Sequence, residues 1–214
     1  MAKLLWALAV LAALTLSGCG YNDFQTKDEQ VKAAWGEVLN QYQRRADLIP
    51  NLVATVQGYA QQERDVLIGV TEARAKATSV NVSANDVNDP AKMQQFQQAQ
   101  AQLSGALGRL LVVAEAYPQL KSDANFRELQ AQLEGTENRI TTARNRFIKA
   151  VQEYNVLARQ FPTNLTAMMF GYKPKASFEV EDEKAIAAPP KVDFAPKSAV
   201  PAAPTPAPAP TPAK

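Results

Sequence analysis

The apolar side chains of this chain recur every three or four residues over long stretches, the spacing of helices that bury one face. The first series runs from Val31 to Ala73, and the second from about Ala91 to Tyr117. The third, from Asp123 to Gln160, repeats every seven residues, as in long helices packed side by side: Phe126, Leu133, Ile140, Phe147, Tyr154 and Phe161. The pattern predicts an all-α fold, an antiparallel bundle of three to four long helices.

Local signals set the expected ends of these helices. The segment Thr26–Glu29 fits a capping box, so we expect the first helix to start there. Pro50 predicts a kink or a break in that helix, because proline lacks an N–H and clashes with the preceding turn. Asp89 ends a loop over residues 79–90 and should cap the next helix, with Pro90 as its first residue.

A short helix is expected after Pro162, over residues 163–170, with Thr163 or Asn164 as its cap. Its apolar side chains should close one end of the bundle: Leu165, Met168, Met169 and Phe170. Either this helix or the break at Pro50 would supply the fourth helix.

The N-terminus has the layout of a secretory signal. Lys3 supplies a positive charge, and the apolar run from Leu4 to Leu16 is shorter than the roughly 20 residues that cross a bilayer. The segment Leu16-Ser17-Gly18-Cys19 contains the only cysteine of the chain and resembles the lipobox of bacterial lipoproteins. The resemblance implies cleavage before Cys19 and acyl chains that hold this residue on a membrane. An ordinary cleaved signal with an incidental cysteine is the alternative.

Composition divides the chain further. We expect a signal peptide over residues 1–18, a lipidated tether over 19–25, a helical bundle over 26–171 and a tail over 172–214. The tail is first acidic and, from Ala187 on, almost entirely alanine and proline, a composition that predicts disorder. Where a cell has two membranes, the absence of an acidic residue after the cysteine favours the outer membrane, facing the periplasm.

The residue types exclude most catalytic chemistry. The chain has no histidine, which excludes serine–histidine and cysteine–histidine catalysis and the usual histidine metal sites. Its 23 basic and 21 acidic residues leave it nearly neutral, without the basic excess that favours nucleic acid. We therefore predict no enzyme, no cofactor, no metal and no nucleic-acid partner. A carboxylate or metal enzyme built near Asp47 or Glu137 is kept as a minor hypothesis.

The densest polar cluster on an apolar helix comprises Arg44, Arg45, Asp47, Pro50 and Asn51. Arg45 falls on the apolar register, and a buried arginine needs a carboxylate or several carbonyls around it. The favoured interpretation is an ion pair between helices that fixes the bundle's register. The alternative is a ligand or partner site at Pro50, where freed carbonyls are available.

A second group of candidate residues, Tyr117, Pro118, Lys121 and Asn125, forms a compact turn between two expected helices. An ordinary turn between helices is the favoured interpretation, and a binding loop is the alternative.

In their order and spacing, these motifs resemble the LemA family. The residues that carry the resemblance are Arg44-Arg45-x-Asp47-Leu-Ile-Pro50-Asn51-Leu52-Val53, Gly58-Tyr59, Tyr117-Pro118-x-Leu120-Lys121, Asn125-Phe126, Leu129-Gln130, Leu133-Glu134, Glu137-Asn138, Ala143-Arg144, Tyr154-Asn155 and Phe161-Pro162. The resemblance covers about residues 22–178 and implies a helical bundle on a membrane-anchored envelope protein. It supplies no reaction and no catalytic residues.

These observations predict a non-enzymatic lipoprotein that binds or scaffolds other envelope proteins in the bacterial cell envelope. Its partners would be the membrane, through lipid on Cys19, and other envelope proteins, with the oligomeric state left open. The alternative is a spacer linked to the cell wall, with the proline- and alanine-rich tail in contact with peptidoglycan.

Overall fold

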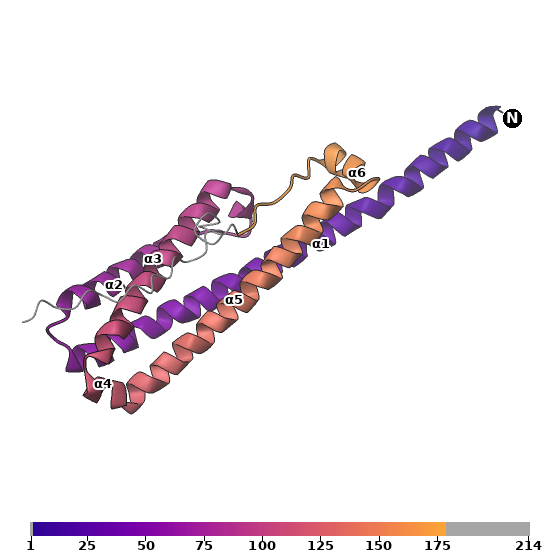
Figure 1. Cartoon of the computed structure of the whole chain (residues 1–214). Helices are drawn as coiled ribbons and strands as arrows, with labels where there is room; N and C mark the ends of the chain where they lie inside the picture. Colours follow the sequence, from indigo (N-terminus) through magenta and orange to yellow (C-terminus); the bar gives the residue numbers. More distant parts are fainter. Residues whose placement is uncertain (1, 179–214) are drawn as a thin grey trace, which may run out of the picture. The chain divides into compact units, whose positions relative to one another are not determined.

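The computed structural model describes residues 2–178, and for residues 2 and 4–19 it describes the helical backbone without the side chains. In chain order the helices are α1 (Ala2–Tyr59), α2 (Arg64–Ser79), the 3-10 turn η1 (Asp86–Asn88), α3 (Pro90–Glu115), α4 (Pro118–Ser122), α5 (Ala124–Arg159) and α6 (Thr163–Phe170). Within residues 2–178 there is no strand, and α1 and α5 run antiparallel side by side (Figure 1). The predicted all-α bundle is confirmed.

The first helix begins earlier than its sequence predicts. α1 runs through the expected capping box, and the Thr26 hydroxyl donates to the carbonyl oxygen of Asn22, 2.9 Å away, as threonines inside helices do. Phe24, in the expected tether, is fully buried. The predicted start at Thr26 is therefore wrong, and residues 20–25 form part of the packed helix.

The fourth helix comes from a break that the sequence pattern concealed. Pro50 lies inside α1, which continues to Tyr59, so no break occurs there. The chain turns at residues 60–63, where the backbone N–H of Glu63 donates to the carbonyl oxygen of Ala60 at 3.1 Å. Because apolar residues keep their spacing across this turn, periodicity alone did not reveal it. α2, rather than a break at Pro50 or α6, completes the bundle.

Buried side chains form two clusters along the bundle, one around Trp35 on α1 and one around Leu52. α5 contributes to both, and its seven-residue repeat is buried as predicted at five positions: Phe126, Leu133, Ile140, Phe147 and Tyr154. Phe161, the last residue of the repeat, follows the end of α5 and is 80% exposed. Asp89 caps α3 as predicted, accepting from the backbone N–H groups of two residues in its first turn.

The packed unit extends past the expected boundary at residue 171. Tyr172 stacks on Phe24 with ring centroids 4.6 Å apart, and the Phe178 ring lies 5.4 Å from that of Phe147. Tyr172 and Phe178 both pack against the Trp35 cluster. The predicted division at 171 is therefore wrong by a short segment, while the rest of the predicted tail, residues 179–214, lies outside the described residues.

Lys175 fixes this C-terminal segment to two helices. Its ammonium is 2.7 Å from a carboxylate oxygen of Asp28 on α1 and 4.7 Å from the centre of the Tyr154 ring on α5. Its backbone N–H donates to the side-chain oxygen of Asn155 at 2.7 Å. These contacts give residues 172–178 a fixed place in the bundle.

α6 forms where predicted but packs differently. Pro162 occupies its N-cap position without a side-chain hydrogen bond, so neither Thr163 nor Asn164 caps it. The side chains expected to close the bundle are exposed: Leu165, Met168, Met169 and Phe170. Ala167 is the residue of α6 that is buried. Among the described helices, none is both long enough and apolar enough to cross a membrane.

Candidate functional site

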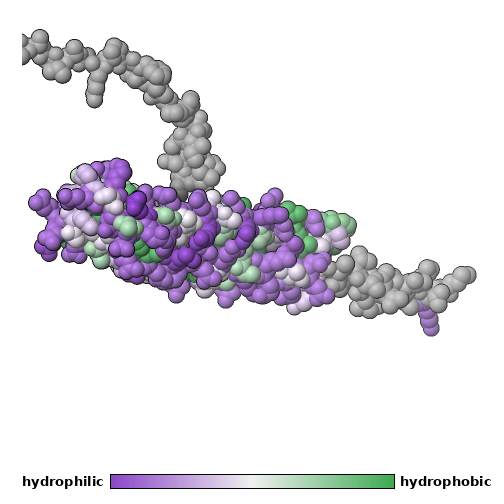
Figure 2. Space-filling model, turned by 90° about the horizontal axis from the view of Figure 1, so that it is seen from below, coloured by the Kyte–Doolittle hydropathy of each residue, from purple (hydrophilic) through white to green (hydrophobic). Residues whose placement is uncertain are grey.

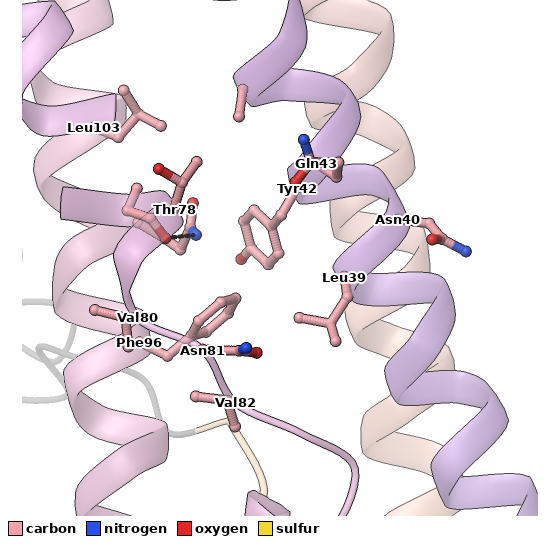
Figure 3. Close-up of a pocket in the computed structure, with 13 residues that line it drawn as sticks. Leu39, Asn40, Tyr42, Gln43, Thr78, Val80, Asn81, Val82, Phe96 and Leu103 are labelled. Carbon is pink, nitrogen blue, oxygen red and sulfur yellow. Dashed lines mark hydrogen bonds between the residues drawn. The ribbon is translucent and has the colours of Figure 1, made fainter. Parts of the chain in front are cut away.

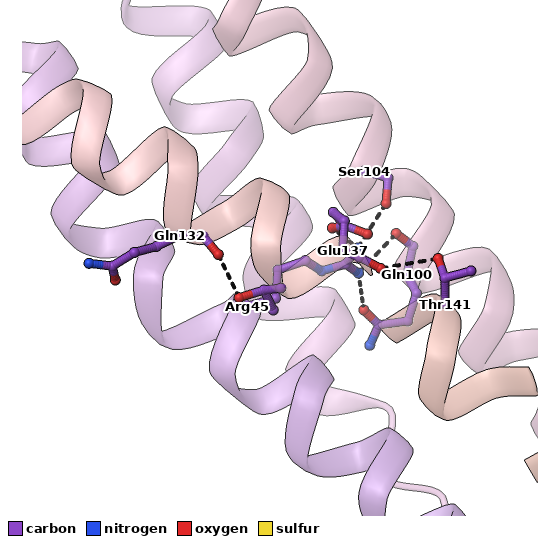
Figure 4. A network of polar contacts seen from close by, with 7 residues as sticks. Arg45, Gln100, Ser104, Gln132, Glu137 and Thr141 are labelled. Atoms are coloured by element: carbon purple, nitrogen blue, oxygen red, sulfur yellow. Dashed lines mark hydrogen bonds and ion pairs between the residues drawn. The ribbon is translucent and has the colours of Figure 1, made fainter. Parts of the chain in front are cut away.

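Arg45 links three helices at the middle of the bundle (Figure 4). Its side chain is 1% exposed, and its guanidinium donates to Glu137 on α5 at 2.7 Å and to the Ser104 hydroxyl on α3 at 2.9 Å. The Gln100 side-chain oxygen on α3 accepts a further bond of 2.5 Å. The ion pair between helices that the sequence predicted is therefore present, and its cation is the buried partner.

Gln100 explains the polar position that interrupts the apolar pattern of α3. Besides accepting from Arg45, its side-chain amide donates to the carbonyl oxygen of Ala77 on α2 at 3.4 Å. The Tyr42 ring lies 5.1 Å from the Arg45 guanidinium carbon, and burial raises the pKa of Tyr42. The Arg45 network, defined here as Arg45, Gln100, Ser104 and Glu137, thus contacts all four helices of the bundle.

The backbone carbonyl that Pro50 leaves without a donor accepts a hydrogen bond from another helix of the protein. Proline at position 50 has no N–H for the carbonyl of Ala46, four residues earlier. The Arg74 side chain of α2 supplies the missing donor, with its Nε 2.7 Å from that oxygen. α1 therefore continues through Pro50 with this carbonyl satisfied. Arg74 was not among the predicted residues, although Val70 and Ala77, about one turn before and one turn after it on α2, are both buried.

Arg44, Asp47 and Asn51 are exposed, at positions that share the outward face of α1. Gln43 donates its side-chain amide to the Asp47 carboxylate at 2.8 Å, a contact between neighbouring turns. We call Arg44, Asp47 and Asn51 the outer face of α1. The structure therefore divides the predicted cluster into a buried arginine and an exposed polar face.

The second predicted group lies at the end of the bundle where α1 and α2 join. The Tyr117 hydroxyl donates to Glu63 at 3.2 Å, and the Tyr59 hydroxyl donates to Asp123, the N-cap of α5, at 3.0 Å. The backbone N–H of Phe126 and the Tyr59 hydroxyl lower the pKa of Asp123.

The remaining members of that group lie on the surface. Pro118 is the first residue of α4, Lys121 pairs with Glu115, and Asn125 is exposed in the first turn of α5. Arg45 lies 14 residues before the end of α1, about 21 Å along the helix axis. The two predicted groups therefore form separate features rather than one site.

A cavity of about 310 Å³ opens beside the Arg45 network, between α1, the end of α2 and α3 (Figure 3). Apolar side chains and uncharged polar groups line it: Leu39, Asn40, Tyr42, Gln43, Ala46, Ala77, Thr78, Val80, Asn81, Val82, Phe96, Gln100 and Leu103. Gln100 joins the cavity to the network. The lining has no charged side chain, so it offers hydrogen bonds and aromatic contact without an ionised acid or base.

Two further predictions concern ligands. Within residues 2–178, no group of three or more histidine, cysteine, aspartate or glutamate side chains is placed to hold a metal. Glu137, considered for a carboxylate or metal site, is the anionic partner of Arg45. Cys19 lies in α1 immediately before Gly20, and its lipidation stays a prediction.

Comparison with known proteins identifies the family. The family model of the LemA family matches residues 34–194, more than half of the chain. Two magnetosome proteins of Paramagnetospirillum magneticum, MamQ 1 and MamQ 2, are each 25% identical over 189 residues, covering 80% of this chain and 69% of theirs. Magnetosome protein MamQ of Magnetospirillum gryphiswaldense is 27% identical over 186 residues, covering 78% of this chain and 67% of its own. The match includes both predicted groups of residues, and the chain belongs to the LemA family.

Proposed function

We propose that this protein is a lipid-anchored lipoprotein of the bacterial cell envelope that binds other envelope proteins and carries out no reaction of its own. The observation that carries the proposal is the continuity of α1, which extends from Ala2 to Tyr59. This single helix joins the Leu16–Cys19 motif to the Arg45 network. A membrane attachment at Cys19 would thus be connected to the bundle without a flexible segment.

The chemistry of the described residues supports binding rather than catalysis. Arg45 and Glu137, the charged pair inside the bundle, are used to join helices. The chain contains no histidine, and its single cysteine is the proposed site of lipidation. The names of the MamQ relatives associate them with magnetosomes and state no reaction. In a cell with two membranes, the protein would lie on the outer membrane and face the periplasm.

The outer face of α1 is the proposed partner surface. Its three residues present a guanidinium, a carboxylate and an amide on one side of a continuous helix. These groups are exposed, whereas Arg45 on the same helix is engaged within the bundle. A continuous helix fixes the backbone that carries these groups, so a partner would have to order only their side chains.

Fatty-acid labelling in cells tests the anchor. Cells that make the full chain are fed a tagged fatty acid, and the protein is isolated and fractionated with the membranes. We expect label on the parental protein and none on Cys19→Ser, which should also accumulate as the uncleaved form. Equal label on both proteins would contradict attachment at Cys19.

Crosslinking in intact cells, followed by affinity purification and mass spectrometry, tests the binding role. Arg44→Glu is the test variant, and Arg109→Glu, which replaces another exposed arginine, on α3, is the matched control. We expect the same envelope proteins on the parental and Arg109→Glu baits and their loss from Arg44→Glu. Equal capture by all three baits would exclude the outer face of α1 as the partner surface.

Deletion of residues 189–214 separates this proposal from the alternative of a cell-wall spacer. The proline- and alanine-rich composition of this segment favours the alternative. A scaffold that acts through its bundle keeps its partners after the deletion. Recovery of wall fragments that depends on the deleted segment would instead support the spacer.

A further inference from the structure

The segment from Phe161 to Phe170 exposes an unusual amount of apolar surface. Of the eleven large hydrophobic side chains exposed in the described part of the chain, five lie here: Phe161, Leu165, Met168, Met169 and Phe170. Their exposed fractions range from 52% to 80%. Single exposed apolar residues are ordinary, but a contiguous group of this kind marks a surface that contacts something else. We call these five residues the α6 patch.

The α6 patch lies beside the N-terminal part of α1. A Cβ atom added to Gly20 would lie 3.0 Å from the Thr166 hydroxyl, so the backbone of α1 touches α6 directly. One residue later, the ring of Tyr21 lies 5.1 Å from that of Phe170. In the view of Figure 2, hydrophobic residues gather toward the right-hand end of the bundle, which is the end where α6 lies in Figure 1.

This position places the patch next to the most apolar stretch of the sequence. Cys19 directly precedes Gly20, and the run from Leu4 to Leu16 precedes Cys19. If the signal is removed, lipid on Cys19 would bring residue 20 to the bilayer surface. If the signal is retained, its apolar run would enter the bilayer and hold residue 20 near the same surface. Either attachment would bring the α6 patch to the same membrane surface.

The charges around α6 are compatible with that surface. Residues 163–170 contain no charged side chain, so their entry into the interface between headgroups and acyl chains would bury no charge. Two exposed basic residues, Arg159 and Lys173, flank the helix in the sequence. Asp23 is an exposed acidic residue on the adjoining part of α1. Apolar contact rather than charge should therefore dominate, as in helices that lie in an interface.

We propose that the α6 patch inserts into the bilayer interface and fixes the end of the bundle on the membrane. This inference rests on the proposed function in one respect, the attachment of the protein at its N-terminus. It adds a second contact, through which the lipid surface covers Phe161, Leu165 and the two methionines. The bundle would then be oriented by two contacts rather than turning about one.

A depth measurement on the full chain tests the proposal. Met168→Cys introduces a thiol for an environment-sensitive fluorophore, and the protein is placed in vesicles of phosphatidylethanolamine and phosphatidylglycerol. Val112→Cys on α3, where the native side chain is 72% exposed, is the matched control. We expect a quencher on the lipid acyl chains to reduce the fluorescence at 168 several-fold more than at 112. Iodide, a quencher dissolved in the water, should reduce the fluorescence at 112 more than at 168.

The parental chain separates failure of the anchor from failure of the patch. With Cys19 lipidated, the parental protein takes up no fluorophore; if it takes up label, the proposed lipid anchor is wrong. Both variants are then measured again with Cys19→Ser, in which residue 168 or 112 carries the only thiol. Acyl-chain quenching at 168 would still support the docking of α6.

Two results would overturn the proposal. Equal exposure of residues 168 and 112 to iodide, without acyl-chain quenching, would show that the patch lies in water. Shielding of residue 168 from both quenchers, lost when the protein is diluted within the vesicles, would show that a second copy of the chain covers the patch.

Discussion

The middle of the bundle buries a charged residue, and the α6 end exposes apolar ones, whereas folded proteins usually do the reverse. The middle buries a charge, Arg45, at 1% exposure, whereas the α6 end exposes Met168 at 79%. Arg45 has partners on two other helices, and Met168 belongs to a patch that the bundle leaves uncovered. The difference teaches that two residues in unexpected environments need different explanations. The buried charge joins helices within the protein, whereas the exposed apolar patch calls for a contact outside it.

The largest effect should come from removing the buried charge. Arg45→Ala removes the cation from Glu137 and leaves Gln100 without its donor, so it should destabilise the bundle by about 3 kcal/mol. Chemical denaturation of the full chain measures this loss. Arg44→Ala, its exposed neighbour, is the control and should change stability little. A loss no larger than that of the control would show that Arg45 does not stabilise the fold.

A smaller effect is expected at Pro50, where the bundle supplies a missing donor. Arg74→Ala should cost about 1 to 2 kcal/mol, because the carbonyl of Ala46 loses its hydrogen bond. Introducing Pro50→Ala first restores an N–H from the helix itself. In the Pro50→Ala background, Arg74→Ala should lower the free energy of unfolding by clearly less than it does in the parental protein. An equal cost in both backgrounds would contradict the assigned role of Arg74.

Acid should weaken the contact between Asp28 and Lys175. Although burial opposes the effect, hydrogen bonds from Lys175 and Lys32 lower the pKa of Asp28 below its ordinary value of 3.8. The carboxylate therefore contributes stability above pH 3.8, and this contribution is lost as the pH falls through the lowered pKa. Asp28→Asn should flatten this part of the stability–pH profile. An unchanged profile would contradict the assignment.

The smallest effect on stability should come from the α6 patch. The double variant Met168→Ser/Met169→Ser should change the free energy of unfolding by no more than about 0.5 kcal/mol, because both side chains already face outward. Denaturation without lipid measures this change. A large loss would show that the patch stabilises the bundle and would remove the contrast with Arg45.

Local sequence signals predicted much of the fold. The seven-residue repeat of α5 predicted a row of large buried side chains, five of which are buried, and Asp89 before Pro90 identified the start of α3. Arg45 was predicted to pair across helices because a charge on an apolar register needs a partner. Each of these predictions depended on residues close together in the sequence.

Other features depended on contacts between distant residues. The spacing of apolar residues continues through the turn at 60–63, so periodicity could not separate α1 from α2. Arg74 is 28 positions away from the carbonyl that it satisfies. For α6, composition indicated a helix but could not distinguish an apolar face in the core from one facing outward. The packing of Tyr172 was equally hidden, since its partner Phe24 lies near the other end of the chain.

Hydrogen exchange tests most directly whether α1 is one continuous helix that joins the membrane-proximal end to the Arg45 network. Amide exchange of the full chain is measured in lipid vesicles over residues 20–34 and, for comparison, over residues 35–49. A continuous packed helix predicts similar slow exchange in both segments. Fast exchange confined to residues 20–25 would show a flexible tether and contradict the account.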